Sequence, residues 1–312
     1  MEYLIQTKPD HLFYLLEKIL KDYYENIIYE KDKYLMAIGE ITICLLAHVD
    51  TVFDDAMITK EKELFYDREK QVLFCPDGAG FDDKAGIYSI IKIIQQGYKP
   101  HILFTNGEER GGIGATAFAN NFTTPNVEIK YFIELDRQGS NDCVFYDCGN
   151  SVFHKYVESF GFETKNGSYS DISFIAPIWD VAAVNLSIGY YNEHSYSEYL
   201  NLKHMHNTID KVCYMLSSAA DIETSFGFMP VKKENYFSLI KPKKCNNCGK
   251  EYSLTNLLDI SLDENKNELV CLECLSKFYE WCEGCGKFFN ITNVKNEMGI
   301  CDDCAKRISQ IL

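Results

Sequence analysis

The sequence predicts an α/β domain with a mostly parallel central sheet, followed by a small domain built around metal-binding cysteines. In the first part of the chain, short apolar runs of about the length of one strand alternate with longer amphipathic segments. Strands separated by helical segments tend to pair in parallel, and helices then cover both faces of the sheet. Eight of the 13 cysteines lie after residue 244, all in Cys-x-x-Cys pairs, which indicates the second domain.

The elements of the first domain follow from the positions of these segments. The Thr-Lys-Pro-Asp sequence at residues 7–10 is a helix start signal, and it opens an amphipathic helix. Polar residues at 58–74 predict a hairpin. Apolar runs predict strands at residues 41–46, 101–105, 130–135 and 181–188, and amphipathic segments predict helices at residues 84–96, 151–160 and 207–226.

The change in composition sets the expected domain boundaries. We divide the chain into a domain of residues 1–227, a linker of residues 228–244 and a cysteine-rich part of residues 245–312. Residues 241–312 contain 10 Lys/Arg and 11 Asp/Glu, so nearly all of the net charge of −15 lies in the preceding residues. An acidic body of this kind disfavours binding to nucleic acid or to an anionic membrane surface.

The chain carries no recognisable membrane or export signal. No run of 18 apolar residues occurs, so no transmembrane helix is expected. The N-terminal residues lack the basic segment and the cleavage site of a signal peptide. We therefore expect a cytoplasmic protein, in which cysteines bind metal ions rather than form disulfides.

Five short segments carry acidic and histidine residues in a fixed order. They are AHVDTV around His48 and Asp50, GFDDKAG around Asp82, NGEERGG around Glu108 and Glu109, ELDRQG around Asp136, and YYNEHS around His194. Four of them follow or end a predicted strand, and the carboxyl ends of strands in an open α/β sheet meet at one crevice. Asp82 opens a predicted helix, where the helix dipole also favours an acidic residue. We therefore expect these side chains to converge.

Taken together, the segments resemble the co-catalytic zinc exopeptidases. This group contains the bacterial leucyl aminopeptidase and aminopeptidase Y, with the aminoacylases, peptidase T and the glutamate carboxypeptidases as relatives. HxD, DDK, GEE, Asp and His occur here in the family order, over roughly residues 40–215. The resemblance implies a three-layer, phosphorylase/hydrolase-like fold and a peptide-hydrolysing enzyme that uses two zinc ions.

The resemblance also implies a role for each residue. Asp82 would bridge the two zinc ions, and Glu108 would be the general base that takes a proton from water. His48 and Asp136 would complete one zinc site, and Glu109 and His194 the other. Asp50, two residues after His48, is placed to accept a hydrogen bond from the imidazole and to fix its tautomer. Ligands of these types also accept Mn²⁺ or Co²⁺.

Three of these assignments have rivals in the sequence. Asp83 competes with Asp82 for the bridging position, although the first aspartate of DDK is the ligand in the family. Glu134 competes with Asp136, because residues two apart share one face of a regular strand. His206, in the sequence HNTID, competes with His194.

The spacing of the segments predicts a minimal enzyme. The 33 residues between His48 and Asp82 and the 57 between Asp136 and His194 leave no room for the inserted domains of larger relatives. This favours an aminopeptidase. Without a lid, an oxyanion must be stabilised from within the domain, and the candidate residues are Tyr169, Tyr190 and Tyr191.

Two other functions remain open. An N-acyl amino acid deacylase or a carboxypeptidase would need a cationic group for the substrate carboxylate, which Arg110 or Arg137 can supply. The other rival is a non-catalytic adaptor that acts through its zinc ribbons. The retention of Glu108 argues against the adaptor, because a protein that only binds has no use for a base.

The cysteine-rich part predicts two structural zinc sites. Two Cys-x-x-Cys pairs are separated by 22 residues and the next two by 15, and the first pair of each unit continues as Cys-Gly-Lys. Four thiolates hold zinc tetrahedrally, and a segment this small depends on metal to fold. The expected sites are Cys245, Cys248, Cys271 and Cys274, and Cys282, Cys285, Cys301 and Cys304. We interpret these zinc ribbons as a surface for a protein partner or for substrate recruitment.

Overall fold

The computed structural model describes residues 1–53, 62–122, 127–146, 150–219, 222, 226–228, 243–252, 257–263, 266–282, 287–291, 304 and 306. The chain divides into two compact units, Met1–Val231 and Lys232–Leu312. The boundary falls inside the linker predicted at residues 228–244, most of which lies outside the described residues. Each unit is described by itself.

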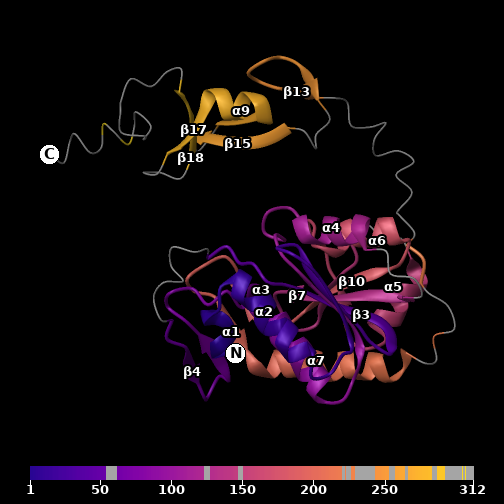
Figure 1. Ribbon diagram of the computed structural model, residues 1–312. Coiled ribbons are helices and arrows are strands. Elements are labelled where there is room, and N and C mark those ends of the chain that lie inside the picture. The colour runs from indigo at the N-terminus through magenta and orange to yellow at the C-terminus, as the bar shows by residue number, and fades with distance from the viewer. Residues whose placement is uncertain are drawn as a thin grey trace. The chain divides into compact units, whose positions relative to one another are not determined.

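The first unit is built on an eight-stranded sheet (Figure 1). Its four central strands, β6, β3, β7 and β10, are parallel to one another, whereas β1, β2 and β8 run antiparallel to their inner neighbours. The mostly parallel sheet predicted from the sequence is therefore confirmed. In spatial order the strands are β1 (Asn26–Glu30), β2 (Tyr34–Ile38), β6 (Pro100–Thr105), β3 (Ile41–His48), β7 (Tyr131–Arg137), β10 (Ala183–Ser187), β8 (Asp142–Val144) and β9 (Glu163–Thr164).

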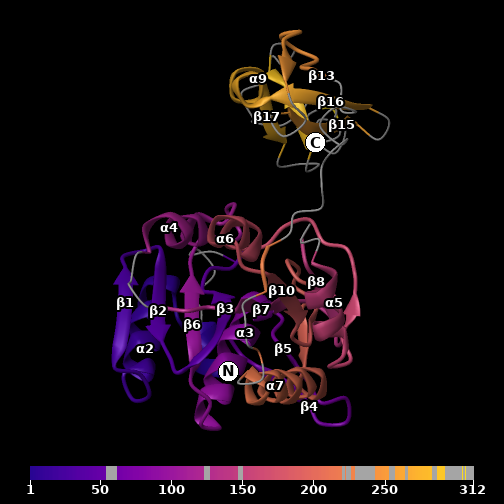
Figure 2. The ribbon, with the colours of Figure 1, turned by 90° about the vertical axis from the view of Figure 1, so that its right-hand side faces the viewer.

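Helices cover both faces of this sheet and make a three-layer architecture (Figure 2). On one face, α4 (Ile113–Asn121) and α6 (Ile172–Trp179) pack against each other and against the strands. The opposite face is covered by α3 (Phe81–Gln95) and α7 (Leu202–Ser217), with α1 (Glu2–Gln6) against α3. The remaining helices of this unit are α2 (Pro9–Leu20), which contacts β2, and α5 (Ser151–Glu158), which contacts β9.

A second, smaller sheet lies in the same unit. Its order is β11 (Tyr190–Tyr191), β12 (Tyr199–Asn201), β5 (Val72–Phe74) and β4 (Phe65–Asp67), all antiparallel. The β4–β5 pair is the described part of the hairpin predicted at residues 58–74. Because β12 pairs with β5, the segment that follows β10 is joined to the segment that precedes α3.

The predicted closing helix is displaced towards the N-terminus. It was expected at residues 207–226, but α7 begins at Leu202 and ends at Ser217. The side chain of Asn201 accepts a hydrogen bond from the backbone N–H of His204 and so starts the helix earlier than the apolar pattern indicates. Within the part of the chain that the structure describes, no helix is both long and apolar enough to cross a membrane.

The described residues of the second unit include short antiparallel pairs and the helix α9. The pairs are β13 (Lys243–Lys244) with β14 (Glu251–Tyr252), β15 (Leu257–Asp263) with β16 (Lys266–Cys271), and β17 (Tyr279–Cys282) with β18 (Lys287–Asn290). Its helix, α9 (Leu272–Phe278), follows β16 directly. The buried residues that form its core are Cys245, Val270, Cys271, Cys274 and Tyr279. Three of these five are cysteines, so metal-binding residues make up much of the core that the structure describes in this unit.

The aromatic cluster around Phe118 joins α4 to α6 and to the sheet. The ring of Phe118 is fully buried and stacks on Trp179 with centroids 5.1 Å apart. The ring also makes edge-to-face contacts with the rings of Tyr34 of β2 and Phe132 of β7. This side chain therefore bridges elements that are far apart in the sequence.

We expect Phe118→Ala to lower the free energy of unfolding by about 3–5 kcal/mol, because it removes a buried ring and leaves a cavity. Urea unfolding followed by circular dichroism measures the change. Tyr14→Ala is the matched control, since Tyr14 is 70% exposed, and should change the stability by less than about 0.5 kcal/mol. Equal effects of the two substitutions would contradict this description of the core.

Candidate metal centre

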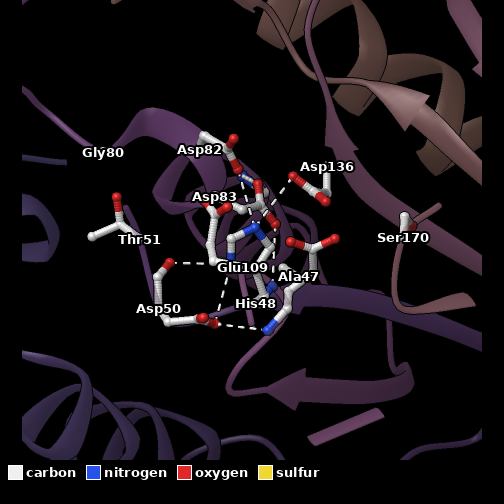
Figure 3. Close-up of polar contacts among 12 residues, drawn as sticks. Ala47, His48, Asp50, Thr51, Gly80, Asp82, Asp83, Glu109, Asp136 and Ser170 are labelled. Atoms are coloured by element: carbon white, nitrogen blue, oxygen red, sulfur yellow. Dashed lines mark hydrogen bonds and ion pairs between the residues drawn. The ribbon is translucent and has the colours of Figure 1, made fainter. Parts of the chain in front are cut away.

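Four of the five acidic and histidine segments lie together at one edge of the main sheet, as the side chains of His48, Asp82, Glu109 and Asp136 show (Figure 3). His194, from the fifth segment, lies beside Asp82 and Glu109. His48 is the last residue of β3, and Asp136 is the second-last residue of β7. Glu108 and Glu109 follow β6, and Asp82 stands at the start of α3. The parallel arrangement of β6, β3 and β7 brings their carboxyl ends to the same edge, as expected for an open α/β sheet.

Two groups of possible ligands share Asp82. His48 Nε2 lies 3.0 Å from Asp82 Oδ1 and 3.4 Å from Asp136 Oδ1. His194 Nε2 lies 3.0 Å from Asp82 Oδ2 and 3.2 Å from Glu109 Oε1. In each group the ligand atoms all lie within 4.8 Å of one another. Each oxygen of one carboxylate thus faces a different histidine, which is the arrangement that a bridging ligand requires.

The rival residues have other partners or positions. Asp83 is fully buried, and its carboxylate accepts hydrogen bonds from the backbone N–H groups of His48 at 3.3 Å and Gly86 at 2.8 Å. Glu134 is also buried and accepts from the Ser170 hydroxyl and from the Asp171 N–H. His206 is exposed on α7. None of the three belongs to a ligand group in the described part of the chain.

Asp50 connects the end of β3 to the loop that carries the glutamates. Its Oδ1 accepts from the backbone N–H groups of Gly107 at 2.7 Å and Glu108 at 3.2 Å. The Nδ1 atom of His48 lies 3.0 Å from the backbone oxygen of Asp50 and 3.4 Å from its carboxylate. With a proton on Nδ1, the imidazole donates to Asp50 and leaves Nε2 free to bind a metal ion.

Glu198 holds the backbone at Asp82, a function that the sequence interpretation did not assign. Its buried carboxylate accepts from the N–H of Gly80 at 2.8 Å and from the N–H of Asp82 at 2.9 Å. Burial raises the pKa of Glu198 to about 7, although the backbone donors oppose this shift. The one signal in the sequence is its position four residues after His194. Glu198 therefore connects the loop of His194 to the start of α3.

The conformation of the backbone just before Asp82 requires a glycine. Gly80 has a φ of +66°, and a Cβ atom there would lie 2.8 Å from the Thr51 hydroxyl. A larger residue would strain the backbone and push away the segment that follows His48. The glycine in GFDDKAG thus allows Asp82 to approach the end of β3.

The acidic residues of the centre repel one another in the absence of a cation. Burial raises the pKa of Asp136 to about 7, and the charge of Asp82 adds to the shift. Burial raises the pKa of Glu108 to about 9, and Asp136, Asp171 and Glu109 add to it. The hydrogen bonds of Asp82 to the two histidines outweigh its burial and lower its pKa. Divalent cations would remove this repulsion.

The neighbouring lysine does not balance these charges. Lys84 is buried, and its ammonium donates to the backbone oxygen of Val49. Burial lowers its pKa to about 8. The Oε1 atom of Glu109 is buried and has no hydrogen-bond partner, although the His194 ring lies 3.2 Å away. Histidine and carboxylate donors with an unsatisfied buried oxygen fit two divalent metal ions.

A cavity of about 290 Å³ opens beside the ligands. Its wall contains Glu108, four of the ligands, and the side chains of Arg137, Gln138, Tyr169 and Glu193. A larger cavity of about 660 Å³ lies over the small sheet, but it contains none of the candidate ligands. We therefore assign the chemistry to the smaller cavity, which holds the buried acidic groups.

The three tyrosines considered for the oxyanion differ in their surroundings. The Tyr190 hydroxyl donates to Asp136 Oδ1 at 3.1 Å, and the Tyr191 hydroxyl lies 2.7 Å from His204 Nδ1. Tyr169 lines the 290 Å³ cavity and is 47% exposed. Tyr190 also lines this cavity, but Tyr169 is the one of the three for which no hydroxyl hydrogen bond to another described residue is found.

In the second unit, the first four cysteines lie close together. The sulfur atoms of Cys245, Cys248, Cys271 and Cys274 are all within 4.8 Å of one another, which suits a tetrahedral zinc site. Cys271 precedes α9 and Cys274 lies in its first turn, so the second pair is placed by a helix. Cys282 is buried, but Cys285 and Cys301 lie outside the described residues.

Part of the chain is similar to a known peptidase family. Residues 31–172 match the model of peptidase family M28. This segment contains four of the five ligand segments, and His194 lies beyond it. No curated protein matches the chain. The family match and the fold support a hydrolase of the exopeptidase class.

Several solved structures share the fold. Aminopeptidase PepT from Bacillus cereus is 14% identical, with a TM-score of 0.56, over 70% of this chain and 96% of that one. A tripeptidase from Staphylococcus aureus is 13% identical, with a TM-score of 0.56, over 70% and 96%. The TET aminopeptidase from a marine sediment Thaumarchaeota archaeon is 12% identical, with a TM-score of 0.57, over 69% and 94%. These likenesses confirm the predicted α/β fold.

We expect Glu198→Gln to weaken metal binding at Asp82 by about 10- to 100-fold, because an amide replaces one of the two acceptors that hold the backbone of this ligand. Competition with a chelator measures the affinity. Glu69→Gln, at an exposed position, is the control and should leave the affinity unchanged. Wild-type affinity in Glu198→Gln would show that the backbone at Asp82 needs no support from this carboxylate.

Metal analysis tests the whole set of ligands. We expect about four metal ions per chain, two at the shared Asp82 and two at the cysteines. The double substitution Cys271→Ser, Cys274→Ser should reduce this to about three, as measured by mass spectrometry of metal content. Cys213→Ser, at a buried cysteine of the first unit, should keep about four. An unchanged content in the double variant would exclude the first cysteine site.

Proposed function

We propose that the first unit is a zinc-dependent aminopeptidase in which Glu108 is the general base. One observation carries this proposal: the two oxygens of Asp82 face two separate ligand groups, and Glu108 belongs to neither of these groups. With His48 and Glu109, Glu108 forms a third possible metal-binding group, whose ligand atoms lie within 4.8 Å of one another, but this group does not include Asp82. A glutamate kept out of both groups but adjacent to them is placed to move a proton.

The residues of the chain divide the work of hydrolysis. Two divalent ions held at Asp82 would acidify a water molecule and polarise the carbonyl group of the substrate. Glu108 takes the proton from the attacking water and delivers it to the departing amine. Burial raises the pKa of Glu108 when no cation is present, and bound divalent ions would lower it again, so that the carboxylate can accept the proton of the water. Tyr169, on the cavity wall, is placed to donate a hydrogen bond to the oxyanion.

The charge of the cavity supports a substrate with a free amine. Glu193 lies on the cavity wall, next to His194 in the sequence, and its Oε1 accepts from Gln138 Nε2 at 2.6 Å. Gln138 therefore orients a carboxylate that is not one of the proposed ligands. An ammonium group is the natural partner of such a carboxylate, and this favours an unblocked N-terminus.

A second candidate function rests on Arg137. This residue lines the cavity, whereas Arg110 is exposed and outside it. A cation on the cavity wall is what an N-acyl amino acid deacylase or a carboxypeptidase needs for the substrate carboxylate. The two functions differ in the substrate amine, which is free for the first and blocked for the second.

For the second unit we propose a structural and recruiting role. Its four clustered cysteines would hold zinc, and the surface they fix would bind a protein partner or the substrate. We also place the protein in the cytoplasm. None of the ten cysteines that the structure describes forms a disulfide, which suits a reducing compartment.

We expect Glu108→Gln to lower kcat by about 10²- to 10⁴-fold while both metal ions stay bound, because the change removes a base and not a ligand. Hydrolysis is measured on unblocked peptides and on N-acyl amino acids, with Zn²⁺ or Co²⁺ present. Glu163→Gln, at an exposed side chain, is the control. No turnover of any substrate by the metal-loaded wild-type protein would exclude the proposal, and turnover of blocked substrates alone would favour the deacylase.

A further inference from the structure

Arg137 places an unpaired cation in an acidic cavity. It is the last residue of β7, directly after Asp136, and its side chain lines the 290 Å³ cavity. Its guanidinium donates from one terminal nitrogen to the backbone oxygen of Asn166 at 3.3 Å. Its Nε atom is buried and has no hydrogen-bond partner. Among the described residues Arg137 forms no ion pair.

A buried guanidinium N–H without an acceptor is costly, since its desolvation is not compensated. The other charged residues of the wall are acids or the His194 imidazole. Metal ions would engage most of these acids, which leaves Arg137 to attract an anion from solution. The planar guanidinium matches a carboxylate, which can accept two parallel hydrogen bonds from it.

The wall of the same cavity also carries a negatively charged side chain. Glu193, oriented by Gln138, suits an ammonium group, as argued for the proposed function. A cavity that binds both an ammonium and a carboxylate selects a molecule whose amine and carboxylate are both free. A volume of about 290 Å³ is at the lower end of the range of small-molecule sites, so the two ends must be close together.

We propose that Arg137 binds the free carboxylate of the residue that leaves, and that the substrates are dipeptides with both termini free. This inference rests on the proposed function and refines it. In a dipeptide the carboxylate follows directly after the scissile bond, so it lies near the metal centre. A longer peptide carries this charge farther away, and an amide lacks it. Arg137 thus restricts the substrates to dipeptides. Its positive charge, which the deacylase alternative requires, has a use in the aminopeptidase as well.

Binding measurements on the Glu108→Gln protein test the proposal without turnover. Isothermal titration calorimetry, with Zn²⁺ present, compares leucyl-leucine with its C-terminal amide and with N-acetyl-leucyl-leucine. We expect the free dipeptide to bind about 10- to 100-fold more tightly than the amide, the range of a charged hydrogen-bonded contact. Equal affinities for the acid and the amide would overturn the proposal.

Substitution of the arginine then identifies the contact. In the Glu108→Gln background, Arg137→Gln should reduce the affinity for leucyl-leucine to that for the amide. Arg137→Lys, which keeps the charge but loses the planar fork, should recover part of the preference. Arg110→Gln is the matched control and should keep the full preference. A preference for the free acid that persists in Arg137→Gln would overturn the proposal. If Arg137→Gln does not fold, Arg137→Lys is compared with the unsubstituted arginine instead, by the ratio of the affinities for the acid and for the amide.

The two proposals fail separately. An intact preference for the free acid together with no hydrolysis by the wild-type protein would contradict the aminopeptidase but support the carboxylate contact. Hydrolysis of dipeptide acids and amides at equal kcat/KM would support the aminopeptidase and contradict the contact. Tighter binding of the N-acetylated dipeptide than of the free one would contradict the role of Glu193 in the zwitterionic site.

Discussion

The arrangement of the site depends on the Asp82 carboxylate, which presents one oxygen to His48 and the other to His194 at 3.0 Å each. A carboxylate can do this only if its backbone is fixed. Glu198 fixes it by accepting hydrogen bonds from the N–H groups of Gly80 and Asp82. Glu198 and His194 lie in the same loop. This loop therefore supplies one proposed ligand, His194, and also holds the backbone of another, Asp82.

The same arrangement is unfavourable without cations, since acids are gathered where water cannot screen them. The raised pKa values of Asp136 and Glu108 are the consequence. The fold tolerates the cluster because the sheet and its helices bury a large apolar core beneath it. Among the described residues of the second unit, three of the five core side chains are cysteines. If these cysteines bind zinc as proposed, metal binding and folding of this unit would be coupled.

Much of the fold was predictable because its central strands are buried on both faces. The runs at residues 41–46, 101–105, 130–135 and 181–188 are mostly apolar and correspond to β3, β6, β7 and β10. The outer strand β1 is partly exposed, so its pattern is weak. The start of α7 was misplaced because a capping asparagine, and not the apolar period, sets it. Local signals thus locate the centre of the sheet better than its edges.

The sequence by itself predicted which residue types gather at the candidate site, because the residues at strand ends limit which atoms can meet at one edge of a parallel sheet. It favoured Asp136 and His194 through the family pattern but left Glu134 and His206 as rivals, since both members of each pair have suitable atoms. The tertiary structure brought Asp136 and His194 to Asp82 and gave Glu134 to Ser170 and Asp171. It also placed Arg137, and not Arg110, on the cavity wall. The physical reason is that side-chain direction and burial are set by packing between segments distant in the chain.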